Sequence, residues 1–142
     1  MRKLGLDVGD KTIGVAVSDA LNMTAQGKTT IERVGIKKDT GKVLDFVREY
    51  EVDTVVIGLP LSMSGSDTEQ TVKTREFAEK LANKLKSNSL DKVAIEFQDE
   101  RLTSVMADRA MLEGDLSREK RKDIIDRQAA VIILQSWLDR VQ

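Results

Sequence analysis

The residues of this sequence that could form a functional site are acids that lie inside apolar segments. Asp7 stands in the run "LGLDVGDKTIGVAVSD", residues 4–19, where leucine and valine alternate with glycine and the acid. This period of two predicts a strand whose apolar side chains share one face, while Asp7 shares the other with glycines. Glycine weakens a strand unless something must come close to its backbone. The run therefore predicts a bare strand surface that carries one carboxylate. The alternative is that Asp7 lies on the solvent face of an antiparallel hairpin.

Three further acids fall at the ends of expected elements. Asp126 opens the segment "IDRQAAVIILQSWL", where apolar residues three, four, seven and eleven positions later place it on the buried stripe of a helix. Its alternative role is a favourable charge in a first helical turn, with Asp123 as part of the N-cap. Asp99 and Glu100 end a strand in "QDERLTS", where they are either site residues or loop acids that Arg101 neutralises.

Residue types that are absent narrow the chemistry. The chain has no cysteine and no histidine, which excludes disulfides, thiolate nucleophiles, imidazole catalysis and serine triads. Asp7, Glu100 and Asp126 are expected at one edge of a sheet, where crowded carboxylates repel one another unless a cation neutralises them. Such a cluster predicts a site for Mg²⁺ or Mn²⁺. Two of these ions about 3.5–4 Å apart can activate a water and stabilise the leaving oxygen of a phosphodiester.

The elements that would position these acids form one domain over residues 1–142. Hydrophobic periodicity predicts strands at 4–8, 13–18, 26–33, 53–60 and 92–98, and helices at 43–50, 66–85, 103–113 and 124–141. Ser66 and Glu69 fit a capping box, and Gly114 fits a C-cap. The order βββαβαβαα predicts an α/β fold, a five-stranded mixed sheet with helices on both faces.

Charge and hydropathy limit the partners. The formal net charge is −1, with 40% hydrophobic and 33% charged residues, so the chain is predicted to be globular and soluble, and any basic surface must be local. No apolar run reaches about 18 residues, so we expect a cytoplasmic protein without a membrane segment. One basic run precedes the last predicted helix: Arg118, Lys120, Arg121 and Lys122. Its position predicts phosphate contacts, and a solvated loop is the alternative.

Four motifs, "DVGDKTIGVAVSD", "VVIGLPLSMSGS", "QDERLTS" and "IDRQAAVIIL", resemble in order and spacing those of the bacterial YqgF family. The resemblance covers nearly the whole chain. It implies the ribonuclease H-like fold of Holliday junction resolvases, with the first strand central in the sheet. It also implies a nuclease, a hydrolase of phosphodiester bonds that processes the 5′ end of pre-16S rRNA, with Asp7, Glu100 and Asp126 as its metal-binding catalytic acids.

The second acid is where this sequence departs from related resolvases. In those proteins the strand beside the central one ends in a glutamate, whereas here it ends "GLP" at residues 58–60. Glu100 would have to reach in from the neighbouring strand, and Asp99 is the alternative.

Structured RNA, such as pre-16S rRNA, is the expected partner, and branched DNA is the alternative. Lys11, Ser64 and Arg101 are expected to contact it; Ser64 belongs to a serine-rich turn before a helix N-terminus, which offers N–H groups and hydroxyls to a phosphate. Two other classes of function stay open: a non-catalytic RNA-binding assembly factor, and an actin-like or sugar-kinase-like phosphate binder suggested by "DVGDKT". The sequence leaves both a monomer and a homodimer open.

Overall fold

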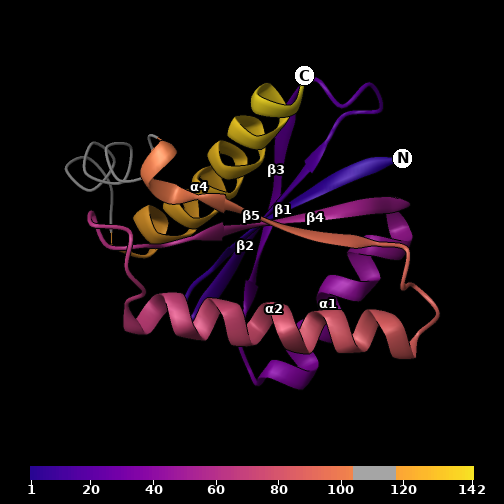
Figure 1. The fold of residues 1–142 in the computed structure, drawn as a ribbon, viewed down its shortest axis with the longest axis horizontal. Helices are drawn as coiled ribbons and strands as arrows, with labels where there is room; N and C mark the ends of the chain where they lie inside the picture. The colour runs from indigo at the N-terminus through magenta and orange to yellow at the C-terminus, as the bar shows by residue number, and fades with distance from the viewer. Residues whose placement is uncertain (104–117) are drawn as a thin grey trace.

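The computed structural model describes residues 1–103 and 118–142, with the side chains of all of these except residues 118–126. Its elements are β1 (Arg2–Val8), β2 (Thr12–Ser18), β3 (Ala25–Glu32), α1 (Ile36–Glu49), β4 (Val52–Leu59), α2 (Glu69–Ser87), β5 (Ala94–Asp99), the 3₁₀ turn η1 (Glu100–Leu102) and α4 (Arg118–Val141) (Figure 1). The helix predicted at 103–113, with its cap at Gly114, lies outside the described residues except for Thr103, which ends η1.

The five strands form one mixed sheet in the order β3-β2-β1-β4-β5. Antiparallel pairing joins β1 to β2 and β2 to β3, whereas β1 pairs with β4 and β4 with β5 in parallel. The predicted mixed sheet is confirmed, and the first strand is central, as the family resemblance implied. Because β1, β4 and β5 run in one direction, their carboxyl ends lie at the same edge of the sheet.

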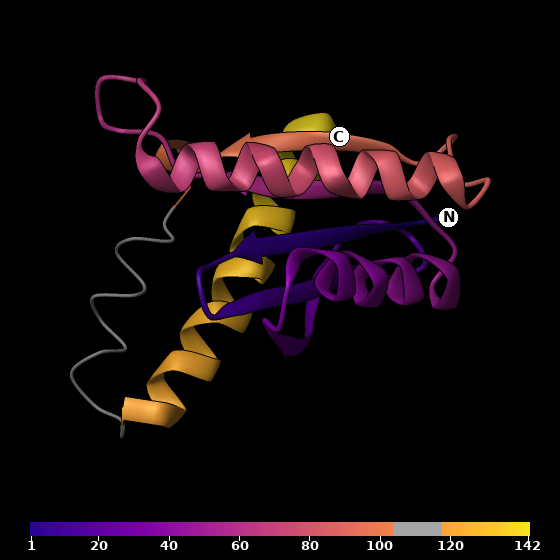
Figure 2. The same ribbon diagram turned by 90° about the horizontal axis from the view of Figure 1, so that it is seen from below.

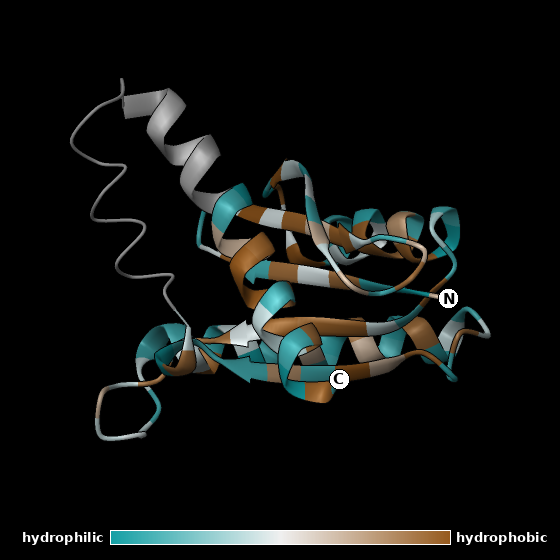
Figure 3. Ribbon diagram, turned by 90° about the horizontal axis from the view of Figure 1, so that it is seen from above, coloured by the Kyte–Doolittle hydropathy of each residue, from teal (hydrophilic) through white to brown (hydrophobic). Residues whose placement is uncertain are grey.

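Helices cover both faces of the sheet (Figure 2). Leu4 and Leu6 of β1 belong to a core beneath α1 and α2, whereas Val56 of β4 belongs to a second core beneath α4. This two-sided burial explains why β4 is an almost continuous apolar run. Figure 3 shows long hydrophobic stretches in the central strands of the sheet, while α1 and α2 alternate between hydrophobic and hydrophilic residues.

Helix α4 lies unusually close to β1. A Cβ atom built on Gly5 would lie 2.6 Å from the Cβ of Leu134 and 3.0 Å from the carbonyl oxygen of Ala130. Ala129 and Ala130 are fully buried at this crossing. The two small alanines therefore let the helix approach the sheet, and a glycine on the strand is equally necessary.

Three predicted helix starts were wrong. Helix α1 begins at Ile36 and not at residue 43, because the more polar residues before Val43 continue the same helix. The cap of α2 is Thr68, whose hydroxyl accepts from the N–H of Thr71 at 3.2 Å, and the Thr71 hydroxyl accepts from the N–H of Thr68, so Ser66 and Glu69 form no capping box. Helix α4 already includes Arg118, six residues before its predicted start, because lysine and arginine are good helix formers and nothing between Arg118 and Ile124 breaks a helix. The predicted basic loop is therefore helical. No helix in the described part of the chain is both long enough and apolar enough to cross a bilayer.

Candidate active site

Asp7 lies near the carboxyl end of the central strand, on the face that α4 covers. It alternates with Leu6, which faces the opposite core, and it shares its face with Gly5, which contacts α4. Its side chain is only 7% exposed, so the alternative of a solvent-facing aspartate is wrong. Across the ladder Asp7 pairs with Gly14 of β2, and Gly58 of β4 follows directly after the last paired residues on its other side. Neither neighbour has a side chain, so the predicted bare surface exists, but beneath a helix.

Glu100 reaches this surface from the end of β5. It begins η1, is 9% exposed, and its carboxyl carbon lies 3.4 Å from the position that a Cβ atom on Gly58 would take. Strand β4 separates β5 from β1, and neighbouring strands lie about 4.8 Å apart. The missing side chain at Gly58 therefore lets the Glu100 carboxylate extend over β4 toward Asp7. This geometry explains how a second acid can come from the outer strand.

Asp99, the alternative second acid, is held in an ion pair with Arg101. The Arg101 Nη2 donates to Oδ2 at 2.7 Å, Nε donates to both carboxylate oxygens at 3.1 Å, and the backbone N–H donates to Oδ1 at 2.9 Å. These hydrogen bonds lower the pKa of Asp99 and raise the pKa of Arg101. Because this carboxylate is already neutralised by a neighbouring cation, the geometry favours Glu100 over Asp99 as a metal ligand.

The third predicted acid, Asp126, lies on α4 one turn before Ala130. The carbonyl oxygen of Ala130 approaches Gly5, so α4 covers the face of the sheet that carries Asp7. The side chain of Asp126 lies outside the described residues, and its part in the cluster stays a prediction. Among the side chains that are described, no three acids are grouped closely enough to hold a metal ion.

The described donors have the chemistry that a hard cation requires. Gln98 pairs in register with Gly58, so its side chain lies on the same face as Asp7. It is 2% exposed, and within the described structure its Oε1 accepts no hydrogen bond. A buried amide oxygen on the same face of the sheet as the buried carboxylates of Asp7 and Glu100 provides oxygen donors only, which suits Mg²⁺ or Mn²⁺. Gln98 was not predicted as a site residue, although its place two residues before Glu100 would put it on the same face under strand alternation.

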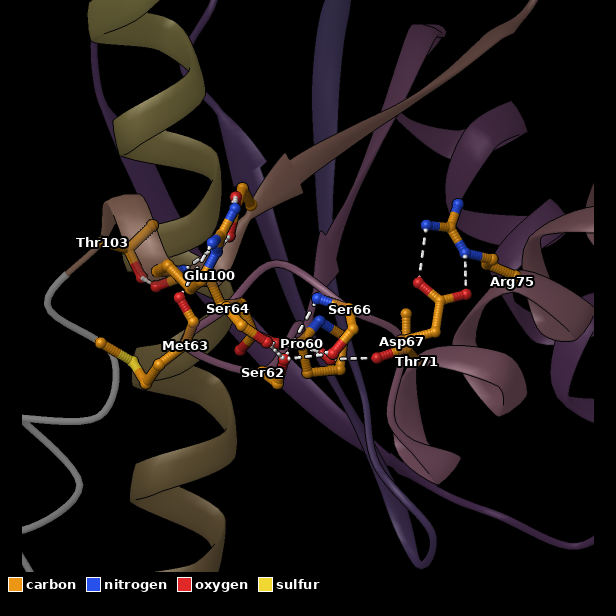
Figure 4. Close-up of polar contacts among 12 residues, drawn as sticks. Pro60, Ser62, Met63, Ser64, Ser66, Asp67, Thr71, Arg75, Glu100 and Thr103 are labelled. Carbon is orange, nitrogen blue, oxygen red and sulfur yellow. Dashed lines mark hydrogen bonds and ion pairs between the residues drawn. The ribbon is translucent and has the colours of Figure 1, made fainter.

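A short loop closes over the end of β4 and lies beside η1. Residues 61–67, here called the serine loop, are pinned at their ends by a bridge between Leu61 and Asp67. Three serine hydroxyls bond one another at 2.7–3.2 Å across the loop: Ser62, Ser64 and Ser66. Arg101 Nη1 donates to the carbonyl oxygen of Met63 at 3.3 Å (Figure 4). Two predicted nucleic-acid contacts, Ser64 and Arg101, thus lie close together next to Glu100.

The other predicted contacts lie on two elements. Lys11 is exposed in the turn that follows β1, and its carbonyl oxygen accepts from the N–H of Arg33. It is therefore at the same edge of the sheet as Asp7. The four basic residues from Arg118 to Lys122 lie in the first turns of α4, and their side chains lie outside the described residues.

Comparison with known proteins identifies the family. A family model described as RuvX, Holliday junction resolvase, matches residues 1–140. The chain belongs to the RuvX family. This confirms the resemblance that the four sequence motifs carried.

Curated relatives of this RuvX-family chain are similar over its full length. A Clostridium novyi (strain NT) protein named "Putative pre-16S rRNA nuclease" is 51% identical over 141 residues, which cover 99% of this chain and 100% of that protein. A Myxococcus xanthus (strain DK1622) protein of the same name is 49% identical over 139 residues, which cover 98% and 88% of the two chains.

A solved structure confirms the ribonuclease H-like fold. The structure of T. thermophilus RuvC in complex with a Holliday junction substrate superimposes with a TM-score of 0.60 at 13% identity, covering 99% of this chain and 95% of that chain. At this identity the similarity shows the fold alone.

Proposed function

We propose that this protein is a metal-dependent nuclease that hydrolyses phosphodiester bonds in structured RNA and processes the 5′ end of pre-16S rRNA. The observation that carries the proposal is that two buried carboxylates, Asp7 and Glu100, lie on either side of the bare backbone of Gly58 at the carboxyl edge of the parallel strands. Relatives 51% and 49% identical are named for the same activity on pre-16S rRNA, which supports RNA as the substrate.

Each acid has a proposed part in the chemistry. Asp7 and Glu100, joined by Asp126 from α4, would hold the cation, and the Gln98 amide oxygen would complete the donor set. When bound, Mg²⁺ or Mn²⁺ supplies the positive charge that neutralises these carboxylates and activates a water for attack on phosphorus. Burial of both described carboxylates beneath α4 strengthens their attraction for a cation, because the surroundings are poorly polarisable.

Phosphate contacts are proposed around this edge of the sheet. The exposed Lys11 lies on one side, and Ser64 lies on the other with Arg101, which is paired with Asp99. A nucleic-acid backbone crossing the edge would therefore meet an ammonium group at one end and guanidinium and hydroxyl donors at the other. The basic first turns of α4 would extend this surface. Because the net charge of the chain is −1, such local cations would account for most of the salt dependence of binding.

Thermal melts of Asp7→Asn test whether Asp7 holds a metal. The substitution removes one charge and preserves the shape, so the variant should be at least as stable as the parent in chelator. It should lose most of the stabilisation that excess Mg²⁺ or Mn²⁺ gives the parent, which at a hundred times the dissociation constant is about 2.7 kcal/mol. Asp10→Asn is the matched control, because Asp10 is exposed and pairs with Lys73 on α2, and it should keep the metal response.

Cleavage assays complete the test. The parent should cut precursor ribosomal RNA only with a divalent ion, and Asp7→Asn should not. Preferential cutting of a four-way DNA junction would instead favour the resolvase function. If Asp7→Asn is clearly destabilised in chelator but keeps its metal response, Asp7 is structural and the proposed function is wrong.

A further inference from the structure

The tip of the serine loop presents an apolar side chain to solvent from a constrained backbone. The Met63 side chain is 83% exposed. The loop beneath it is closed by a Gly65 N–H bond to the Ser62 carbonyl at 2.8 Å and a Ser66 N–H bond to the Ser62 hydroxyl at 3.1 Å. A single exposed methionine on a surface needs no explanation. Met63 differs, because the hydrogen bonds within the serine loop hold its backbone in a defined place.

Arg101 fixes this tip relative to the carboxylates. Its guanidinium donates to the Met63 carbonyl and is itself oriented by Asp99. Its Nη1 would lie only 3.2 Å from a Cβ atom on Gly65, whose φ of 88° also favours glycine, so the guanidinium lies directly against the loop backbone. Arg101 follows Glu100 in η1. The hydrogen bond from Arg101 therefore ties the backbone of Met63 to the residue next to a proposed metal ligand (Figure 4).

A ligand that covers Met63 must combine two kinds of surface. Within one short loop and its neighbour η1 lie the guanidinium of Arg101, which is paired with Asp99, three hydroxyls and two exposed apolar side chains, Met63 and Leu102. A nucleotide offers both surfaces within one residue, because an anionic phosphate is joined to a base with an apolar face. In an uninterrupted helix that face is covered by the neighbouring bases, and only an unstacked nucleotide can present it.

We infer that Met63 packs against the face of an unstacked base next to the phosphate held at the carboxylate edge. The inference rests on the proposed nuclease function and specifies its substrate: a nucleic acid with unpaired nucleotides at the cleavage point. Arg101 and the serine loop position Met63, and Met63 selects the unstacked nucleotide.

Two RNAs of the same duplex sequence test this inference, one blunt and one with a single-stranded 5′ extension. The extension carries 2-aminopurine at the nucleotides nearest the duplex, and Ca²⁺ replaces Mg²⁺ to slow cleavage. We expect the parent to change the 2-aminopurine fluorescence on binding. Met63→Ala should lose that change in fluorescence and bind the extended RNA roughly tenfold more weakly, because the methionine side chain is no longer there to be buried against the base. Its affinity for the blunt duplex should be unchanged.

Met23→Ala is the matched control, because Met23 is a 56% exposed methionine in the turn between β2 and β3. It should bind both RNAs as the parent does, and Met63→Leu should retain the preference for the extended RNA. Equal affinities of Met63→Ala and the parent for the extended RNA, or an equal loss on both RNAs, would overturn the inference while leaving the nuclease function intact. A fall of several degrees in the melting temperature of Met63→Ala would also overturn it, because Met63 would then be packed against the protein itself. Failure of the parent to bind either RNA would overturn the proposed function as well.

Discussion

Replacing Gly5 with alanine tests the close packing of α4 on the central strand. The new methyl group would lie 2.6 Å from the Cβ of Leu134 and 3.0 Å from the carbonyl oxygen of Ala130. Both are fixed parts of the helix, so no side-chain rotation relieves the overlap. Helix α4 must move away from β1, and the contact with Leu134 alone calls for a displacement of about 1 Å, since non-bonded carbons pack at about 3.5–4 Å.

The magnitude follows from the cost of overpacking. Extra methyl groups in a well-packed core cost about 1–3 kcal/mol, and a clash with helix backbone belongs at the upper end of that range. The substitution also restricts the unfolded chain, which offsets about 0.4–1 kcal/mol. We expect Gly5→Ala to lower the free energy of unfolding by about 2 kcal/mol, which for a chain of this length lowers the melting temperature by roughly 6 °C.

Gly41→Ala is the matched control for denaturant and thermal melts. Gly41 lies inside α1, and a Cβ atom there would meet only the Nζ of Lys84 at 3.5 Å, an ordinary contact. Alanine is favoured over glycine inside a helix, so this variant should be more stable than the parent by about 0.5–1 kcal/mol. Equal stability of Gly5→Ala and the parent would refute the close approach of α4 to β1.

Three further predictions address binding, pH and capping. The first concerns three basic residues of α4: Lys120, Arg121 and Lys122. Changing all three to alanine should weaken RNA binding and reduce the slope of log affinity against log salt by about 3, and an unchanged slope would mean that they are merely solvated. Asp99→Asn should lower the free energy of unfolding by a constant amount above about pH 4. The difference between variant and parent should vanish as the pH falls through the pKa of Asp99, which Arg101 holds below its usual value. Urea unfolding between pH 7 and pH 2 measures this difference. Thr68→Ala should lower the free energy of unfolding by about 1 kcal/mol, because it removes the hydroxyl that accepts from the N–H of Thr71. If urea melts showed a larger loss for Ser66→Ala, the cap assigned to α2 would be wrong.

Local patterns in the sequence were sufficient for most of the fold. Alternation predicted β1 with Asp7 on its glycine face, and the apolar run at residues 53–60 predicted a strand, because each pattern records burial directly. The starts of α2 and α4 were mispredicted because several residues could cap or continue each helix. Threonine and serine are near-equivalent caps, and only the fold assigns Ser66 to the serine loop and Thr68 to the helix.

The candidate site was harder to predict because it depends on contacts between distant segments. Glu100 was predicted as the second acid with Asp99 as the alternative, and the sequence could not separate the two. The distinction depends on Gly58, which has no side chain in the path of Glu100, and on Arg101, which engages Asp99. The tie between Arg101 and Met63 spans 38 positions in the sequence and leaves no periodic signal.

The position of α4 at the end of the chain has a consequence during synthesis of the protein. All five strands and both helices of the opposite face precede α4 in the chain, so a ribosome has synthesised the whole sheet before the helix that covers Asp7 exists. Until then the glycine-lined face of the sheet is open to water and to other nascent chains, which is a hazard for slow, long-range folding. A chain that stalls before α4 also lacks Asp126 and the cover that buries Asp7. The proposed cutting activity would therefore be acquired only when synthesis reaches α4, and stalled fragments would be inert toward the RNA around them.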